Sequence, residues 1–197
     1  MKSKKGNDPM DFPTRSQLEQ ELEREKYRRR YGKTLRSTVY TLITVAAVAV
    51  LVATLWLPVL QIYGGSMSPT LQDGDIVVSL KSADFDSGDV VAFYYNNKIL
   101  VKRVIASSGQ WVDIKEDGTV YVDGQPLDEP YLEEKAFGDC NIELPYQVPD
   151  ERVFVMGDHR SVSVDSRNTE VGCVSQEQIV GRIVFRVWPL GGFGTFF

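Results

Sequence analysis

The hydrophobic residues of this chain follow two different patterns. One long apolar run, VYTLITVAAVAVLVATLWL at residues 39–57, lies in a stretch without charged residues between Arg36 and Asp73. From Asp73 onward, apolar residues come in short runs separated by glycine, asparagine, aspartate and proline. The first pattern is typical of a long helix and the second of β-strands, so the chain is predicted to change character near residue 58.

The apolar run predicts a membrane-spanning helix. Its 19 residues would cover about 28 Å at 1.5 Å per residue, close to the ~30 Å hydrocarbon core of a bilayer. Tyr40 and Trp56 lie near its ends, as interfacial aromatics do, and Pro58 gives a natural stop. A buried core helix would show a polar stripe, and a cleaved signal peptide would have a shorter leader and a shorter apolar core. We therefore expect an uncleaved anchor over residues 37–58.

The outer part of the chain is predicted to be strand-dominated. Asp117-Gly118 is a strong hairpin signal, no long helical pattern follows residue 72, and the alternation of strands and helices that marks a parallel sheet is absent. Residues 125–150 are rich in proline, glutamate and aspartate and predict an irregular insertion. We expect a mainly β domain over residues 59–197. Its predicted strands are 75–81, 89–95, 98–107, 111–115, 119–124, 152–158 and 178–188.

Charge separates the two parts further. The chain has a net charge of −5, but residues 1–36 carry 11 Lys/Arg against 6 Asp/Glu, and residues 26–36 hold six basic residues and no acidic one. The positive-inside rule places this basic arm in the cytoplasm and residues 59–197 outside. The arm itself predicts a solvated helix, with Ser16 and Glu19 as a capping box and Glu25 paired with Arg29. Because the outer domain is acidic, nucleic acid is not an expected partner.

The segment YGGSMSPT, residues 63–70, contains the first candidate for chemistry. Gly64 and Gly65 permit unusual backbone angles, and Pro69 stiffens the exit. The N–H of a serine in such a bend, here Ser66, can help to hold an oxyanion. Taken alone, such a segment is more often only a turn.

An activated serine needs a base, and His159 is the only histidine. The other route is a lysine that is neutral at working pH, whereas an unperturbed lysine is neutral in only about one molecule in 2,500 at pH 7. In KILVKRVIAS, a period of two puts Lys102 on one face with Leu100 and Val104. If that face points inward, burial lowers the lysine pKa. The alternative is an edge-strand lysine that discourages aggregation.

The third cluster is GDHRSVSVDSR, residues 157–167, which follows a predicted strand. Both signs of charge alternate there with serine hydroxyls. Such a run is usually a solvated loop, but this mixture also suits a fixed network of ion pairs and hydrogen bonds behind a site. The two cysteines, Cys140 and Cys173, are compatible with one disulfide or with two free thiols. They form no zinc-binding pattern.

Taken together, GGSMSPTL (64–71), GDVVAFYY followed by VKRVI (88–105) and GDHRSVSVDSR (157–167) closely resemble the bacterial type I signal peptidases of the single-span form. The resemblance covers residues 37–188. It implies a strand-rich, partly barrel-like catalytic domain outside the cytoplasm, anchored in the cell membrane. It also implies an acyl-enzyme mechanism, signal-peptide-bearing pre-proteins and the lipid bilayer as partners, and no metal or organic cofactor.

The resemblance assigns roles to individual residues. Ser66 matches the nucleophile and Lys102 the general base, while Ser163 matches the serine that orients the lysine amine. The supporting polar network corresponds to Arg103, Asp158, Asp165 and Arg167, and the substrate site to Ile62, Gly64 and Val101.

Two positions depart from the family pattern. Gly64 stands where some members have a serine whose hydroxyl joins the oxyanion hole, and His159 stands where the family has asparagine. We interpret His159 as part of the supporting loop. The alternatives are a membrane-anchored hydrolase with a Ser-His-Asp triad and a catalytically silent binding module. The C-terminal VWPLGGFGTFF predicts either an interfacial aromatic patch or a last core strand with a frayed tail.

Overall fold

The computed structural model describes residues 14–81 and 85–195. Contacts divide the chain into two compact units near Leu51, an N-terminal helical unit and a strand-rich unit. Within the described residues the elements run as follows: α1 (Arg15–Trp56), β1 (Val59–Gln61), β2 (Ile76–Leu80), β3 (Val90–Tyr95), β4 (Lys98–Ala106), β5 (Trp111–Ile114), β6 (Val120–Val122), β7 (Gln125–Pro126), β8 (Tyr146–Gln147), β9 (Arg152–Met156), β10 (Val174–Ser175), the 3₁₀ turn η1 (Gln176–Gln178), β11 (Ile179–Trp188) and the 3₁₀ turn η2 (Leu190–Gly192).

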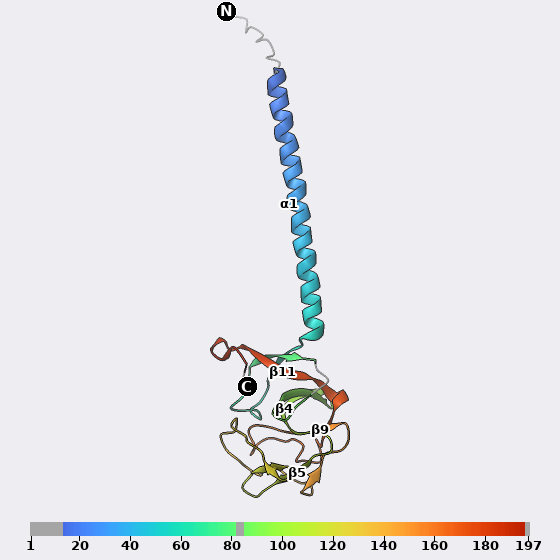
Figure 1. The fold of residues 1–197 in the computed structure, drawn as a ribbon. Coiled ribbons are helices and arrows are strands. Elements are labelled where there is room, and N and C mark those ends of the chain that lie inside the picture. The colour runs from blue at the N-terminus through green and yellow to red at the C-terminus, as the bar shows by residue number, and fades with distance from the viewer. Residues whose placement is uncertain (1–13, 82–84, 196–197) are drawn as a thin grey trace, which may run out of the picture. The chain divides into compact units, whose positions relative to one another are not determined.

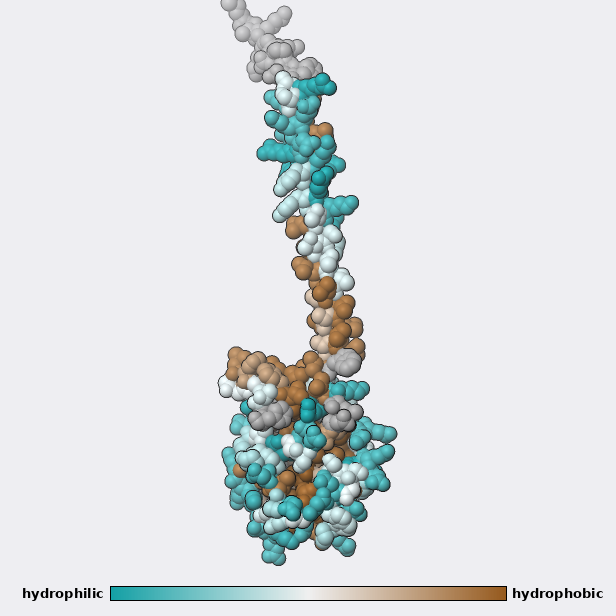
Figure 2. Space-filling view, viewed as in Figure 1, coloured by the Kyte–Doolittle hydropathy of each residue, from teal (hydrophilic) through white to brown (hydrophobic). Residues whose placement is uncertain are grey.

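Helix α1 joins the described part of the basic arm and the predicted anchor in one uninterrupted element of 42 residues. Figure 2 shows the change along it from hydrophilic to hydrophobic side chains. Among the described residues, it is the one helix long and apolar enough to cross a membrane. Glu25 pairs with Arg29 at 3.6 Å, as predicted.

The predicted capping box of α1 is wrong. The helix starts at Arg15, so Ser16 already lies inside it. Thr14 caps it instead, because the Thr14 N–H and hydroxyl both donate to Gln17 Oε1, at 2.8 and 3.0 Å. Residues 1–13 of the predicted cytoplasmic arm lie outside the described residues.

The strands form two antiparallel sheets, so the mainly β prediction is confirmed. Seven strands pair in the order β1-β2-β11-β3-β4-β9-β10 and four in the order β7-β6-β5-β8. Neither sheet closes on itself within the described residues, so the domain is not a closed barrel and partly barrel-like describes it only loosely. Figure 1 shows β11 and β5 at opposite ends of this unit, with β4 and β9 between them.

The predicted strands all appear, each with both ends within two residues of the expected positions. The hairpin at Asp117-Gly118 forms with Lys115 N–H donating to Thr119 O at 3.0 Å, and Gly118 takes a φ of +84° that suits glycine. The insertion at 125–150 is irregular apart from β7 and β8. β1 and β10 were not predicted, because strands of three and two residues are too short to show a periodic pattern in the sequence.

Three hydrophobic clusters form the core. One lies between the second sheet and the β4–β9 region, and includes Phe154 and Val112. A second packs against β3 and β9. The third contains Met67 and Leu71, which are buried directly after Ser66 and fix the loop that carries it. The position of Ser66 is therefore set by core packing.

The cysteines and the C-terminal segment answer two questions that the sequence leaves open. Cys140 and Cys173 are both free thiols, and burial raises the pKa of Cys173 to about 11. The last strand is part of the large sheet, and the chain then folds back so that Arg186 and Gly194 form a bridge. Trp188, Leu190 and Phe193 remain exposed there, and Figure 2 shows apolar surface over this end of the domain.

Candidate active site

Ser66 begins a tight turn shortly after the edge strand β1. The turn closes with Leu71 N–H donating to Met67 O at 2.9 Å, while Ser68 N–H donates to Gly65 O at 3.1 Å. Ile62 N–H and O bond to Asp75 O and Gly74 N–H, which ties the two ends of the loop together. Met67 is buried and Ser66 is half-buried. The loop thus presents one hydroxyl from a rigid base.

Lys102 reaches this hydroxyl from the middle of the large sheet. It lies on β4 and is 3% exposed. Its Nζ lies 2.8 Å from Ser66 Oγ and 3.0 Å from Ser163 Oγ. An exposed edge-strand lysine is therefore the wrong interpretation. Three residues from three separate segments of the sequence meet at one amine.

Burial changes the protonation of this amine. It lowers the pKa of Lys102 from 10.5 to about 8, because the charged form loses hydration, although the carboxylate of Asp165 partly opposes the shift. At a pKa near 8, about one lysine in ten is neutral at pH 7. That fraction is roughly 250 times larger than for a free lysine. A neutral amine 2.8 Å from Ser66 Oγ can accept the hydroxyl proton.

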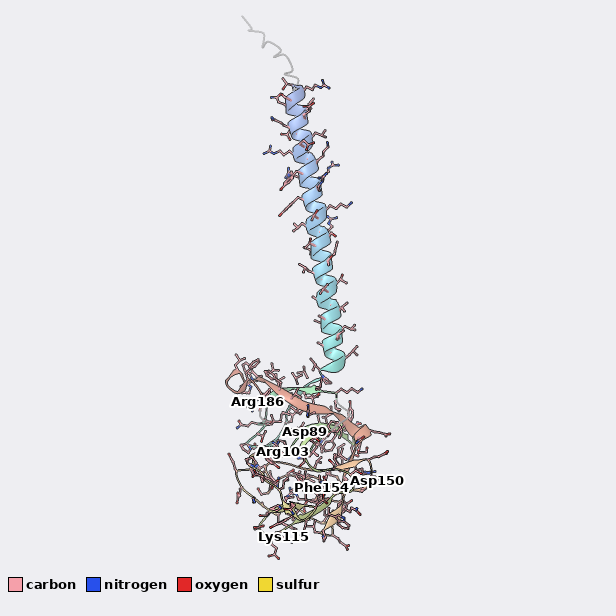
Figure 3. The ribbon with its side chains drawn as sticks, in the orientation of Figure 1. Asp89, Arg103, Lys115, Asp150, Phe154 and Arg186 are labelled. Atoms are coloured by element: carbon pink, nitrogen blue, oxygen red, sulfur yellow. The ribbon has the colours of Figure 1, made fainter. Side chains whose placement is uncertain are left out.

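Arg103, next to Lys102, anchors the other side of β4. It lies in the interior of the unit (Figure 3) and its guanidinium holds Asp158 with two bonds, at 2.8 and 2.6 Å. A third donor reaches Gly88 O at 2.7 Å. The Thr70 hydroxyl donates to Asp158 and accepts from Arg103 at 3.2 Å. This cluster connects β4, the Ser66 loop and the 157–167 loop.

Asp165 and Arg167 hold the 157–167 loop from within. Their side chains are fully buried and bond through Nε at 2.8 Å and Nη2 at 2.8 Å. Burial alone would raise the pKa of Asp165, but the hydrogen bonds and charge of Arg167 outweigh it and keep that pKa below its ordinary value. Asp165 also accepts from Gly157 N–H at 3.0 Å. Of the two interpretations of this loop, the structure therefore shows the fixed network: its charged side chains are buried and paired, while His159, Ser161, Val162 and Val164 remain exposed.

A cleft of about 630 Å³ opens beside Ser66 and Lys102. Its walls come from residues 60–67 around β1 and from 98–102 of β4, and they include Ile62, Gly64 and Val101. β1 pairs only with β2, and β4 pairs with β9 only from Arg103 onward. Within the described residues, each wall therefore has a strand edge free to bond an extended chain.

The backbone N–H groups around Ser66 differ in whether they already have a hydrogen-bond acceptor. Gly64 N–H donates to Asp73 Oδ1 at 2.7 Å, so this donor is already committed. The N–H of Ser66 has no acceptor among the described residues. Gly64 itself has a φ of +85°, which a residue with a side chain rarely adopts. A side chain at this position would therefore strain the backbone, although nothing lies within 4 Å of it.

His159 is placed beside the site but not in it. Its backbone N–H donates to Ser66 O at 3.0 Å. Its side chain is exposed, and in residues 14–81 and 85–195 its imidazole makes no hydrogen bond. The hydroxyl of Ser66 is bonded by Lys102 instead. This geometry does not favour a triad based on His159.

Several residues of the network have little or no signal in the sequence. For Thr70, the one clue is that it lies in the same motif as Ser66, four residues further along the chain. Tyr131, whose ring lies over Arg103, and Glu129, which pairs with Arg160, are in the irregular insertion, where nothing in the local pattern marks them. Arg160 is visible only as one charge among several in its loop. These contacts arise from chain segments that meet only in the folded protein.

Comparisons with known proteins agree on one family. The family model described as "Signal peptidase, peptidase S26" matches residues 35–188. Signal peptidase IB of Staphylococcus aureus (strain COL) is 39% identical over 152 residues, covering 67% of this chain and 78% of that protein. Signal peptidase I of Bacillus caldolyticus is 38% identical over 162 residues, covering 72% and 87%. The crystal structure of a signal peptidase I from Enterococcus faecalis V583 is 28% identical, with a TM-score of 0.44 over 50% of this chain and 96% of that one.

Proposed function

The chain belongs to the signal peptidase family, peptidase S26, and from this premise we propose that Ser66 and Lys102 form its catalytic dyad. The activity is that of a signal peptidase I, a membrane-bound endopeptidase that removes signal peptides from secreted pre-proteins. The observation that carries the assignment is the position of one buried amine between two hydroxyls, 2.8 Å from Ser66 Oγ and 3.0 Å from Ser163 Oγ.

The geometry supports acyl transfer. Neutral Lys102 takes the proton from Ser66 as Ser66 Oγ attacks the scissile carbonyl, and the ammonium then protonates the leaving amine. An ester between Ser66 and the signal peptide remains. Lys102, neutral again, takes a proton from water, which attacks that ester. The ammonium then returns this proton to Ser66 Oγ as the ester bond breaks, and the signal peptide leaves with a new carboxylate. Ser163 accepts a hydrogen bond from the amine and so keeps it pointed at Ser66.

The substrate is proposed to bind in the cleft as an added strand. The free edges of β1 and β4 supply main-chain bonds, and alternate side chains of the substrate face the apolar walls at Ile62 and Val101. We propose that these side chains of the substrate are small. During attack, the uncommitted N–H of Ser66 is the donor available for the developing oxyanion, and Gly64 contributes clearance but no donor.

The rate of cleavage will rise with pH and level off above an apparent pKa near 8. Lys102 must be neutral to act as base, and burial sets its pKa at about 8. Below that value the neutral fraction, and with it kcat/KM, falls about tenfold per pH unit. The measurement is kcat/KM on a signal-peptide substrate between pH 6 and 10. A midpoint near 6.5, the ordinary value for histidine, would point to His159 and contradict the dyad.

The proposal includes the orientation of the chain in the membrane. α1 is the anchor, the basic arm is cytoplasmic, and the peptidase unit lies outside, because residues 26–36, directly before the apolar run, hold six basic residues and no acidic one. Signal peptides are cut where they leave the membrane on that outer side.

Cysteine labelling tests this orientation. In a Cys140→Ser background, Ser108→Cys places an exposed thiol on the peptidase unit and Ser16→Cys places one on the exposed arm. In intact cells, a membrane-impermeant maleimide will modify Cys at 108 at once, and Cys at 16 only after permeabilisation. The reverse order of labelling would show that the chain is inserted the other way round. The parent with Cys140→Ser alone measures labelling of Cys173, which is buried.

A further inference from the structure

The irregular insertion sends one acidic residue into the interior. Glu129 and Arg160 both have fully buried side chains. Arg160 donates from both terminal nitrogens to the two carboxylate oxygens of Glu129, with Nη1 and Oε2 3.3 Å apart. A paired arrangement of this kind fixes the plane of the guanidinium and neutralises its charge. Burying such a pair gives little net stability, so its position next to the active-site loop needs another explanation.

Because the Arg160 guanidinium is fixed, it also holds the peptide group of Gly157 in place. Its Nε donates to Gly157 O at 3.1 Å, and its own carbonyl accepts from Arg167 at 3.0 Å. Gly157 lies between the groups on which the dyad depends. A methyl group built on it would lie 2.2 Å from Ser163 Oγ and 2.5 Å from Ser66 O. With so little free space, the position of Gly157 sets the separation of Ser66 and Ser163.

Tyr131 gives the insertion a second hold on the same network. Its ring lies over the guanidinium of Arg103, 3.8 Å from the centroid, and its hydroxyl donates to Glu129 Oε1 at 2.9 Å. Burial, aided by the Glu129 carboxylate, raises the pKa of Tyr131, so the hydroxyl remains a donor. Arg103 in turn holds Asp158. The insertion therefore contacts Arg160, which belongs to the 157–167 loop, and Arg103, which holds Asp158 of the same loop.

We propose that Glu129 is a positioning residue for the Ser66–Lys102 dyad, acting through Arg160 and the Gly157 peptide. This inference rests on the proposed function. Glu129 holds Arg160, Arg160 holds Gly157, and Gly157 keeps Ser163 Oγ at 3.0 Å from Lys102 Nζ. Neither Glu129 nor Arg160 lines the cleft. Glu129 therefore affects kcat and leaves KM almost unchanged.

The first test is Glu129→Gln in the full-length enzyme in detergent. The amide keeps the size of the side chain but leaves Arg160 with an uncompensated charge and one acceptor fewer. We expect kcat to fall at least tenfold, KM to change less than twofold, and the midpoint of the pH–rate profile to move. Asp89→Asn is the matched control, because its carboxylate pairs with Arg182 at 3.3 Å and contacts no residue of the dyad network. It will lower thermal stability without moving the pH profile.

The double variant Glu129→Gln, Arg160→Met separates positioning from stability. Removing both charges restores thermal stability toward the parent value, since no buried charge is left unpaired. kcat stays low, because Gly157 O has lost its donor. Recovery of kcat together with stability would overturn the proposal, as would a normal kcat in Glu129→Gln. Ser66→Ala and Lys102→Met are assayed in parallel. If these are active, the dyad itself is wrong; if they are inactive and Glu129→Gln is normal, only the role of Glu129 fails.

Discussion

Replacing Lys102 by methionine will reduce signal-peptide cleavage by a factor of about a thousand or more, and Ser66→Ala will do the same. Methionine keeps the length of the side chain in an environment that is 3% exposed, but it cannot accept the Ser66 proton. Loss of either the proposed nucleophile or the proposed base removes the whole covalent route. The effects of Ser66→Ala and Lys102→Met on the rate are therefore not additive. Because a buried amine is replaced by an apolar group, the melting temperature of Lys102→Met will stay at or above the parent value. The measurement is processing of a secretory precursor, with thermal unfolding of each variant.

His159→Asn is the matched control for this pair. The imidazole is exposed and does not reach the Ser66 hydroxyl, and only the backbone of His159 bonds to Ser66. We expect cleavage within about threefold of the parent, well below the effects of one active-site group. Near-total loss in His159→Asn would favour a Ser-His-Asp hydrolase. Full processing by Ser66→Ala or Lys102→Met would instead favour a silent binding module.

Gly157→Ala will lower kcat by a factor of about a hundred or more, the size reported when a catalytic group is displaced by about 1 Å. The added methyl would lie 2.2 Å from Ser163 Oγ and 2.5 Å from Ser66 O, and real carbon atoms do not approach so closely. Either Ser163 or the Ser66 backbone must move, and each movement breaks a contact of Lys102. Stability will fall as well, since Gly157 N–H bonds to the buried Asp165. Steady-state kinetics below the melting temperature separate the two effects.

Gly191→Ala makes the same chemical change where nothing lies within 4 Å of the new methyl and the backbone is not in the left-handed region. It should leave kcat and the melting temperature unchanged. If Gly157→Ala also kept its parent kcat, the loop would have more freedom than this packing allows. The argument that Gly157 spaces Ser66 and Ser163 would then fail.

Local patterns in the sequence were enough to predict the elements that depend on local chemistry. The membrane helix follows from length and hydropathy, and the hairpin at Asp117-Gly118 follows from turn preference. The pattern left open whether the face with Leu100, Lys102 and Val104 points inward, and in the structure Lys102 and Val104 are buried. β1 could not be predicted in this way, because a strand of three residues next to a membrane anchor is too short to show an alternating pattern.

The residues of the candidate site could not be brought together from local sequence patterns alone. Ser66 and Lys102 were paired through a resemblance, and no spacing in the chain says that they meet. The contacts that were missed join residues far apart in sequence, as between Glu129 and Arg160. An isolated glutamate in a polar, irregular segment looks the same whether it faces water or a buried arginine. Only the fold of the insertion distinguishes the two.

The distances along the chain between the groups at the Lys102 amine have a consequence for the life of the enzyme. Lys102 is 36 residues from Ser66 and 61 from Ser163, and β4 lies between β3 and β9 in the large sheet. No local segment can bring these groups together before the large sheet has assembled. With the proposed dyad, a newly synthesised chain therefore carries no proteolytic capacity while it is still folding. The acquisition of activity coincides with completion of the native topology, which spares neighbouring unfolded chains, and the nascent enzyme itself, from premature cutting.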